Sequence, residues 1–145
     1  MKLLAVDYGV SRTGLAVCDE TELVVTPVTP QIEEKSMNKV AEAVTAQAAA
    51  RGAGAIVLGL PRNMDGTEGA RAAKSHRLAE KLRAASGLPV VLWDERRTTV
   101  SAAAILSDNE TFGARRKARL DSVSAAVLLE SYLGWRRHHP EEEPV

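Results

Sequence analysis

Three carboxylates stand where the sequence predicts the end of a buried strand or the start of a buried helix. Asp7 follows the apolar run LLAV, Glu95 ends the run VVLWDE, and Asp121 lies at the start of LDSVSAAVLLESYL. An ionised carboxylate among apolar side chains is costly unless it is paired or binds a metal ion. These three residues are therefore the first candidates for a catalytic site.

The periodicity of each segment places its carboxylate in line with apolar side chains. Side chains alternate between the two faces of a strand and recur every three to four residues on a helix. The resulting sets are Leu3, Ala5 and Asp7; Val91, Trp93 and Glu95; and Asp121, Ala125, Leu128 and Tyr132. Asp94 falls on the face opposite Glu95, so it is the weaker candidate of that acidic pair.

The donor atoms favour a hard metal ion. Carboxylate oxygens suit Mg²⁺ or Mn²⁺ rather than zinc. The chain has one cysteine, and its histidines, His76, His138 and His139, lack the spacing of a metalloprotease helix. Two divalent ions about 4 Å apart would suit in-line hydrolysis of a phosphodiester, because one lowers the pKa of the attacking water and the other stabilises the leaving oxygen.

Each acid also has an ordinary structural interpretation. Asp7 could form a turn, Asp94 and Glu95 could end a solvated strand, and Asp121 could cap a helix. The coincidence of three such acids at the ends of elements favours a shared site.

Candidate phosphate contacts lie in the segments around these acids. In the turn DYGVSRTG, the missing side chain of Gly9 would let a phosphate approach the backbone. The full set is Gly9, Arg12, Arg62, Asn63, Arg96, Thr98, Arg115, Arg116 and Lys117. The plain alternatives are exposed surface arginines, an ordinary strand-to-helix connection and a solvated basic loop.

The composition is that of an ordinary globular protein. A chain of 145 residues fits one domain. No apolar stretch approaches the roughly 20 residues that span a bilayer, and no signal segment is evident, so we expect a cytosolic protein. The formal net charge of +0 means that any site for a polyanion is a local patch. Cys18 is expected to be a small buried hydrophobe, and a lone cysteine excludes an intramolecular disulfide.

Short apolar runs alternate with helical patterns along the chain. Residues 2–7 and 14–19 predict a hairpin, and a proline-interrupted strand over 23–29 is expected at a sheet edge. The remaining expectations are a helix over 36–51, a strand over 55–60, a helix over 70–85, a strand over 90–95, a helix over 99–107, a mobile loop over 107–119 and a helix over 120–133. This order predicts a mixed sheet with helices on its faces, in one domain over 1–134 with a disordered tail over 135–145.

Three segments together resemble the YqgF (RuvX) family of bacterial RNase H-like nucleases. They are LAVDYGVSRTGLAV, IVLGLPRNMDGTEG with VVLWDERRTTV, and LDSVSAAVLLESYL. The resemblance implies an α/β, RNase H-like fold with a five-stranded mixed sheet in the order 3-2-1-4-5, flanked by helices. It also implies a metal-dependent nuclease whose acids are Asp7, Glu95 and Asp121. Arg97 and Ser124 depart from the family pattern, and neither removes an expected ligand.

Four functions are compatible with these residues. The leading hypothesis is a Mg²⁺- or Mn²⁺-dependent nuclease of structured RNA, since the family is described as maturing the 5′ end of pre-16S rRNA, with ribosomal precursor particles as partners. A Holliday junction resolvase acting on DNA is the near alternative, and it requires a two-fold dimer. The sequence favours a monomer, because no apolar stripe remains for a dimer interface once the core residues are assigned. An actin-like phosphotransferase would need a second lobe. A non-catalytic RNA- or ribosome-binding module is the last alternative, against which the three acids weigh.

Overall fold

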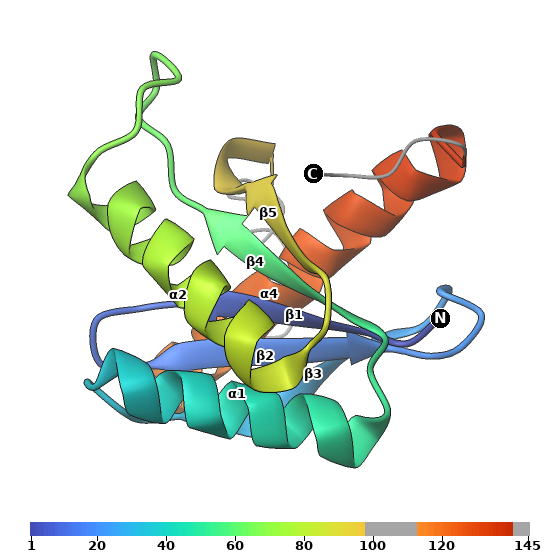
Figure 1. Ribbon diagram of the computed structural model, residues 1–145, viewed down its shortest axis with the longest axis horizontal. Coiled ribbons are helices and arrows are strands. Elements are labelled where there is room, and N and C mark those ends of the chain that lie inside the picture. Colours follow the sequence, from blue (N-terminus) through green and yellow to red (C-terminus); the bar gives the residue numbers. More distant parts are fainter. Residues whose placement is uncertain (98–112, 141–145) are drawn as a thin grey trace.

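The computed structural model describes residues 1–97 and 113–140, and the side chains of residues 1–96 and 122–140. Within these ranges the chain forms five strands, three α-helices and one short 3-10 turn (Figure 1). They are β1 (Leu3–Tyr8), β2 (Thr13–Cys18), β3 (Val25–Ile32), α1 (Met37–Arg51), β4 (Ala55–Leu60), α2 (Ala70–Ser86), β5 (Val90–Asp94), the 3-10 turn η1 (Glu95–Arg97) and α4 (Gly113–His138).

The strands form one mixed sheet in the order β3-β2-β1-β4-β5. β2 pairs antiparallel with both β1 and β3, whereas β1, β4 and β5 run parallel to one another. The predicted fold class, strand order and hairpin are therefore confirmed. β3 lies at the sheet edge, as its prolines predicted, because an edge strand can lose ladder hydrogen bonds on one side.

Helices cover both faces of the sheet. α1 and α2 pack on one face and α4 crosses the other (Figure 1). The core under α4 includes Leu3, Ala5, Val57, Val91, Trp93, Leu128 and Tyr132. The core under α1 and α2 includes Leu4, Val6, Ile56, Leu58, Val44, Leu78 and Leu82. Because β4 is covered on both faces, all six of its residues are buried, as the continuous run AIVLGL predicted.

Local signals set the ends of α1 and α2. The Ser36 hydroxyl accepts a hydrogen bond from the backbone N–H of Lys39 at 3.4 Å and caps α1. Gly52 and Gly87 end the two helices with φ values of 68° and 70°, in the left-handed region that glycine adopts without strain. The predicted boundaries of both helices are confirmed to within one residue.

α4 is longer than the sequence predicted at both ends. It begins at Gly113, so the loop predicted over 107–119 is wrong for residues 113–119, and it ends at His138, so the predicted disordered tail is helical over 135–138. Alanine, arginine and lysine are strong helix formers and need no apolar period to continue a helix. At the other end Trp135 packs 5.8 Å from Trp93, measured between ring centroids. The helix predicted over 99–107 lies outside the described residues.

Two further expectations concern Cys18 and the membrane. Cys18 is 4% exposed, and its Sγ accepts a hydrogen bond from the backbone N–H of Leu3 at 3.3 Å. Burial raises the pKa of this thiol, in keeping with a packing role. None of the helices in the described ranges has the length and apolar character needed to cross a membrane.

Candidate active site at the carboxyl ends of β1 and β5

Asp7 and Glu95 lie at the same edge of the sheet. β1, β4 and β5 are parallel, so their carboxyl ends share one edge. Ala5, two residues before Asp7, and Trp93, two residues before Glu95, both belong to the core under α4. The face that the sequence predicted for Ala5 and Trp93 is therefore confirmed, and position 7 continues it within β1. The strand predicted over 90–95 ends at Asp94, and Glu95 is the first residue of η1.

Gly59 of β4 makes room for the Glu95 side chain. A Cβ at position 59 would lie 3.0 Å from Cγ and 3.1 Å from Cδ of Glu95, and closer still to Oε1. Gly59 pairs with Trp93 on one side, and on the other it lies one residue beyond Leu58, which pairs with Val6. The absence of a side chain therefore lets Glu95 lie over β4, in the direction of β1 and Asp7.

Ser122, the residue after Asp121, attaches α4 to the sheet through a hydrogen bond. Ser122 is fully buried, and its hydroxyl donates a hydrogen bond to the carbonyl oxygen of Val28 at 2.9 Å. Val28 of β3 pairs with Leu15 of β2, which in turn pairs with Val6 of β1. Because Val6 is adjacent to Asp7, this bond holds α4 at the level of the sheet where Asp7 lies. The side chain of Asp121 is outside the described residues, so its direction stays a prediction.

Trp93 attaches the end of β5 to α4. Its Nε1 donates a hydrogen bond to Oγ of Ser131 at 3.2 Å, and its ring meets Tyr132 edge-on with a centroid distance of 5.4 Å. Burial raises the pKa of Tyr132, which is in keeping with the apolar surroundings of this cluster. These contacts fix the backbone from which Glu95 extends.

Asp94 and Arg96 form a pair that stabilises the turn carrying Glu95. Nε of Arg96 lies 2.9 Å from Oδ2 of Asp94, a terminal guanidinium nitrogen lies 2.6 Å from the same oxygen, and the Arg96 backbone N–H donates to Oδ1 at 3.0 Å. The hydrogen bond from the Arg96 side chain holds the pKa of Asp94 below its usual range. Val90 and Leu92, which alternate with Asp94, face α1 and α2. Arg96, predicted to contact phosphate, is therefore engaged with Asp94 on the side away from Glu95.

The loop between β4 and α2 is folded on itself. Nδ2 of Asn63 donates to Oγ1 of Thr67 at 2.9 Å, and Oδ1 of Asp65 accepts from the backbone N–H of Thr67 at 3.0 Å. Arg62 forms an ion pair with Glu68 at 3.5 Å. Asn63 and Asp65 thus shape this loop, while the side chain of Arg62, still 36% exposed, stays accessible to a phosphate.

Gly9 permits the tight connection between β1 and β2. A Cβ at this position would collide with the carbonyl oxygen of Arg12. The turn itself therefore requires glycine here, and contact of Gly9 and Arg12 with phosphate stays a prediction. The remaining predicted contacts have no described side chains; they are Thr98, Arg115, Arg116 and Lys117.

The donors at this edge fit a hard divalent cation. The predicted ligands Asp7 and Glu95 carry carboxylate oxygens, which such a cation prefers, and the Ser122 bond brings position 121 to the same end of the sheet. Among the side chains that the structure describes, no three His, Cys, Asp or Glu residues form a metal-binding group. The side chain of Asp121, the predicted third ligand, is not among the described side chains. Only two of the three predicted ligands, Asp7 and Glu95, could therefore be found there.

Sequence reasoning missed Gly59. The run AIVLGL was interpreted only as a buried strand. A glycine inside such a strand often marks the close approach of another group. That signal could have directed attention to position 59, although the approaching residue is 36 positions away in the sequence and could not be named from it.

The fold places the chain among proteins with the RNase H-like architecture. RuvC of Thermus thermophilus superposes with a TM-score of 0.63 at 12% sequence identity, and 100% of each chain is covered. T. thermophilus RuvC in complex with a Holliday junction substrate gives a TM-score of 0.60, also at 12% identity. At this identity the likeness establishes the fold, and it confirms the RNase H-like class that the sequence predicted.

The sequence itself defines the family. A family model described as RuvX, Holliday junction resolvase, matches residues 1–134. A relative from Syntrophus aciditrophicus is 38% identical over 133 residues, covering 92% of this chain and 88% of its own. One from Symbiobacterium thermophilum is 35% identical over 145 residues, covering 100% of both. Both bear the provisional name pre-16S rRNA nuclease. The chain belongs to the RuvX family, and the predicted resemblance is confirmed.

Proposed function

We propose that this protein hydrolyses phosphodiester bonds with the help of divalent metal ions held by Asp7, Glu95 and Asp121. The observation that carries the proposal is the position of the Glu95 side chain over Gly59, on the strand between those of Asp7 and Glu95. Glu95, the first residue after β5, lies over β4, and β4 lacks at position 59 the side chain that would separate it from the end of β1, where Asp7 lies. Family membership supports the same activity.

The chain's own residues supply the rigidity that such a site needs. Trp93, held by Ser131 and Tyr132, fixes the end of β5, and the Asp94–Arg96 pair fixes the following turn. When bound, two Mg²⁺ or Mn²⁺ ions would lower the pKa of an attacking water and stabilise the leaving oxygen. Asp7, Glu95 and Asp121 would hold these ions, and the hydrogen bond of Ser122 would fix the backbone beside Asp121.

The proposed substrate is structured RNA, in particular a precursor of 16S rRNA. This proposal follows the names of the relatives from Syntrophus aciditrophicus and Symbiobacterium thermophilum. It makes ribosomal precursor particles the natural partners and implies a cytoplasmic protein. Arg12 and Arg62 are proposed to contact the phosphates beside the cut.

A Holliday junction resolvase is the second candidate, favoured by the description of the matching family model. Symmetric cleavage of a four-way junction requires two active sites related by a two-fold axis, and therefore a dimer. An RNA nuclease has no such requirement, so the oligomeric state separates the two proposals.

Incubation with Mn²⁺ against a 16S rRNA precursor and a four-way DNA junction, side by side, tests the substrate. We expect cleavage of the RNA by a protein that sediments as a monomer. Symmetric cleavage of the junction by a dimer would replace the RNA proposal with the resolvase. Cleavage of neither, with thermal stability unaffected by Mn²⁺, would favour a non-catalytic RNA-binding module.

A further inference from the structure

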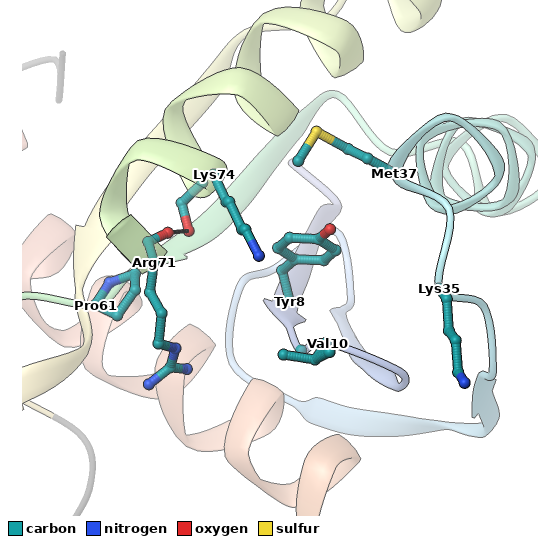
Figure 2. Close-up of a pocket in the computed structure, with 9 residues that line it drawn as sticks. Tyr8, Val10, Lys35, Met37, Pro61, Arg71 and Lys74 are labelled. Carbon is teal, nitrogen blue, oxygen red and sulfur yellow. Dashed lines mark hydrogen bonds between the residues drawn. The ribbon is translucent and has the colours of Figure 1, made fainter. Parts of the chain in front are cut away.

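A second site lies on the opposite side of the sheet edge from Glu95. A pocket of about 330 Å³ opens between the end of β1, the start of α1 and the start of α2 (Figure 2). It is lined by Tyr8, Gly9, Val10, Lys35, Met37, Pro61, Arg71, Lys74 and Ser75. This volume is at the lower end of the range for small-molecule sites, which is the size class of a single nucleotide.

The lining combines a flat apolar surface with positive charge. Tyr8 stands in the middle of the pocket, and Lys74 extends toward it from α2 (Figure 2). Met37 and Val10 add apolar surface, although Val10 is 77% exposed. An aromatic ring beside apolar walls suits the face of a nucleobase, because every base can stack on such a surface.

The positive side chains of the pocket have no acidic counterpart in it. Lys35, Arg71 and Lys74 are among its nine lining residues, and none of the nine is Asp or Glu. No ion pair of these three cations is seen in the part of the chain that the structure describes. Arg71 and Lys74 also lie in the first turns of α2, which contains no acid there and whose Gly69 cap offers no side-chain acceptor. An anion would complement both the side chains and the helix dipole.

The pocket adjoins the proposed active site through consecutive residues. Tyr8 directly follows Asp7 in β1, so their side chains point to opposite faces of the sheet. A nucleic acid strand that crosses this edge can therefore present a phosphodiester to the carboxylates and a neighbouring nucleotide to the pocket.

We propose that this pocket binds one unpaired nucleotide of the substrate RNA, with its phosphate on Arg71 and Lys74 and its base against Tyr8. A base held in a duplex cannot leave its stack to enter such a pocket without the cost of unpairing. The inference rests on the proposed nuclease function and adds the substrate class: RNA with an unpaired nucleotide next to the cleavage site.

The test compares two double variants in EDTA, where no cleavage occurs. Arg71→Ala/Lys74→Ala removes two pocket cations, and Arg77→Ala/Lys81→Ala removes two exposed cations of the same helix that do not line the pocket. Affinity for a short single-stranded RNA and for the matching duplex is measured by fluorescence anisotropy. We expect the pocket variant to bind the single strand roughly tenfold more weakly than the control variant, with little difference for the duplex.

An abasic nucleotide moved along the single strand tests the base contact. In wild type, affinity should fall at one position only, and this dependence should disappear in Arg71→Ala/Lys74→Ala. Equal affinities of the two double variants for the single strand, or no sensitive position, would overturn the pocket proposal even if wild type cleaves RNA. A sensitive position in a protein that cleaves no RNA in Mn²⁺ would support the pocket and contradict the nuclease.

Discussion

The side chain of Glu95 lies over Gly59, so closely that a Cβ at position 59 would require Glu95 to move. This relationship joins β4 to the turn after the neighbouring parallel strand β5, at the edge where Asp7 lies near the end of β1. It also explains why a buried, otherwise aliphatic strand contains a glycine. The position of Glu95 is thus determined by a residue that carries no functional group.

Gly59→Ala tests this relationship directly. The three atoms nearest to the new methyl group all belong to the flexible side chain of Glu95, so the free energy of unfolding should change by about 1 kcal/mol or less. The displaced carboxylate should lower the cleavage rate on the order of 100-fold. Gly134→Ala in α4, where a Cβ has open space apart from Arg137 at 4.0 Å, is the control and should cleave like wild type. Equal activity of the two variants would contradict the proposed role of Gly59.

Ser122→Ala tests how α4 is attached beside Asp121. The substitution removes the buried hydrogen bond to the carbonyl oxygen of Val28 and should cost about 1–3 kcal/mol of stability. Because this bond holds the helix at the level of Asp7, cleavage at a temperature where the variant is folded should also fall. Ser124→Ala, two residues further along the same helix, makes no such bond and should change neither quantity. A loss of stability with full activity would show that the bond does not position Asp121.

The pH dependence of stability should reveal the Asp94–Arg96 pair. The hydrogen bond from Arg96 lowers the pKa of Asp94 in the folded state, so the pair stabilises the fold above the unfolded pKa of about 4 and loses this effect as the pH falls through the folded value. Asp94→Asn should therefore have a Tm a few degrees below that of wild type at neutral pH, and the difference should shrink below about pH 4. Thermal unfolding of both proteins across this range measures it. A difference that is independent of pH would exclude the ion pair as its cause.

The basic residues at the start of α4 should determine the salt dependence of RNA binding. Replacing Arg115, Arg116 and Lys117 with alanine should reduce the magnitude of the slope of log affinity against log salt by about 2, because each phosphate contact on a single strand contributes about 0.7 to that slope. The control is Arg77→Ala/Lys81→Ala, which removes charge from the exposed side of α2. If the triple variant kept the wild-type slope, these residues would not contact substrate phosphates.

The sequence was sufficient for the sheet and for the faces of its strands. Alternation along β1 and β5 placed Ala5 and Trp93 on the face under α4, because successive side chains of a strand point to opposite faces of the sheet. The caps at Ser36 and Gly52 likewise set the ends of α1 through local hydrogen bonds. These features depend on residues close together in the chain.

The partners of several side chains were beyond prediction from the sequence. The hydrogen bonds between Arg96 and Asp94 were not anticipated, because they depend on how η1 leaves β5; contact of the exposed Arg96 side chain with phosphate stays a prediction. The pocket around Tyr8 combines residues of four segments, of which only Gly9 was a candidate from the sequence. The tail was expected to be disordered because its charges hid Trp135, which packs against the core under α4.

Cleavage of a 16S rRNA precursor by wild type and Asp7→Asn, in the presence of Mg²⁺ or Mn²⁺, tests the central claim most directly. The amide keeps the shape of the carboxylate but removes the charge that would hold the metal. We predict a loss of about 100-fold or more in rate with the fold retained, and wild-type rates for the control Asp19→Asn, whose residue lies in the loop after β2. Full metal-dependent cleavage by Asp7→Asn would contradict the account.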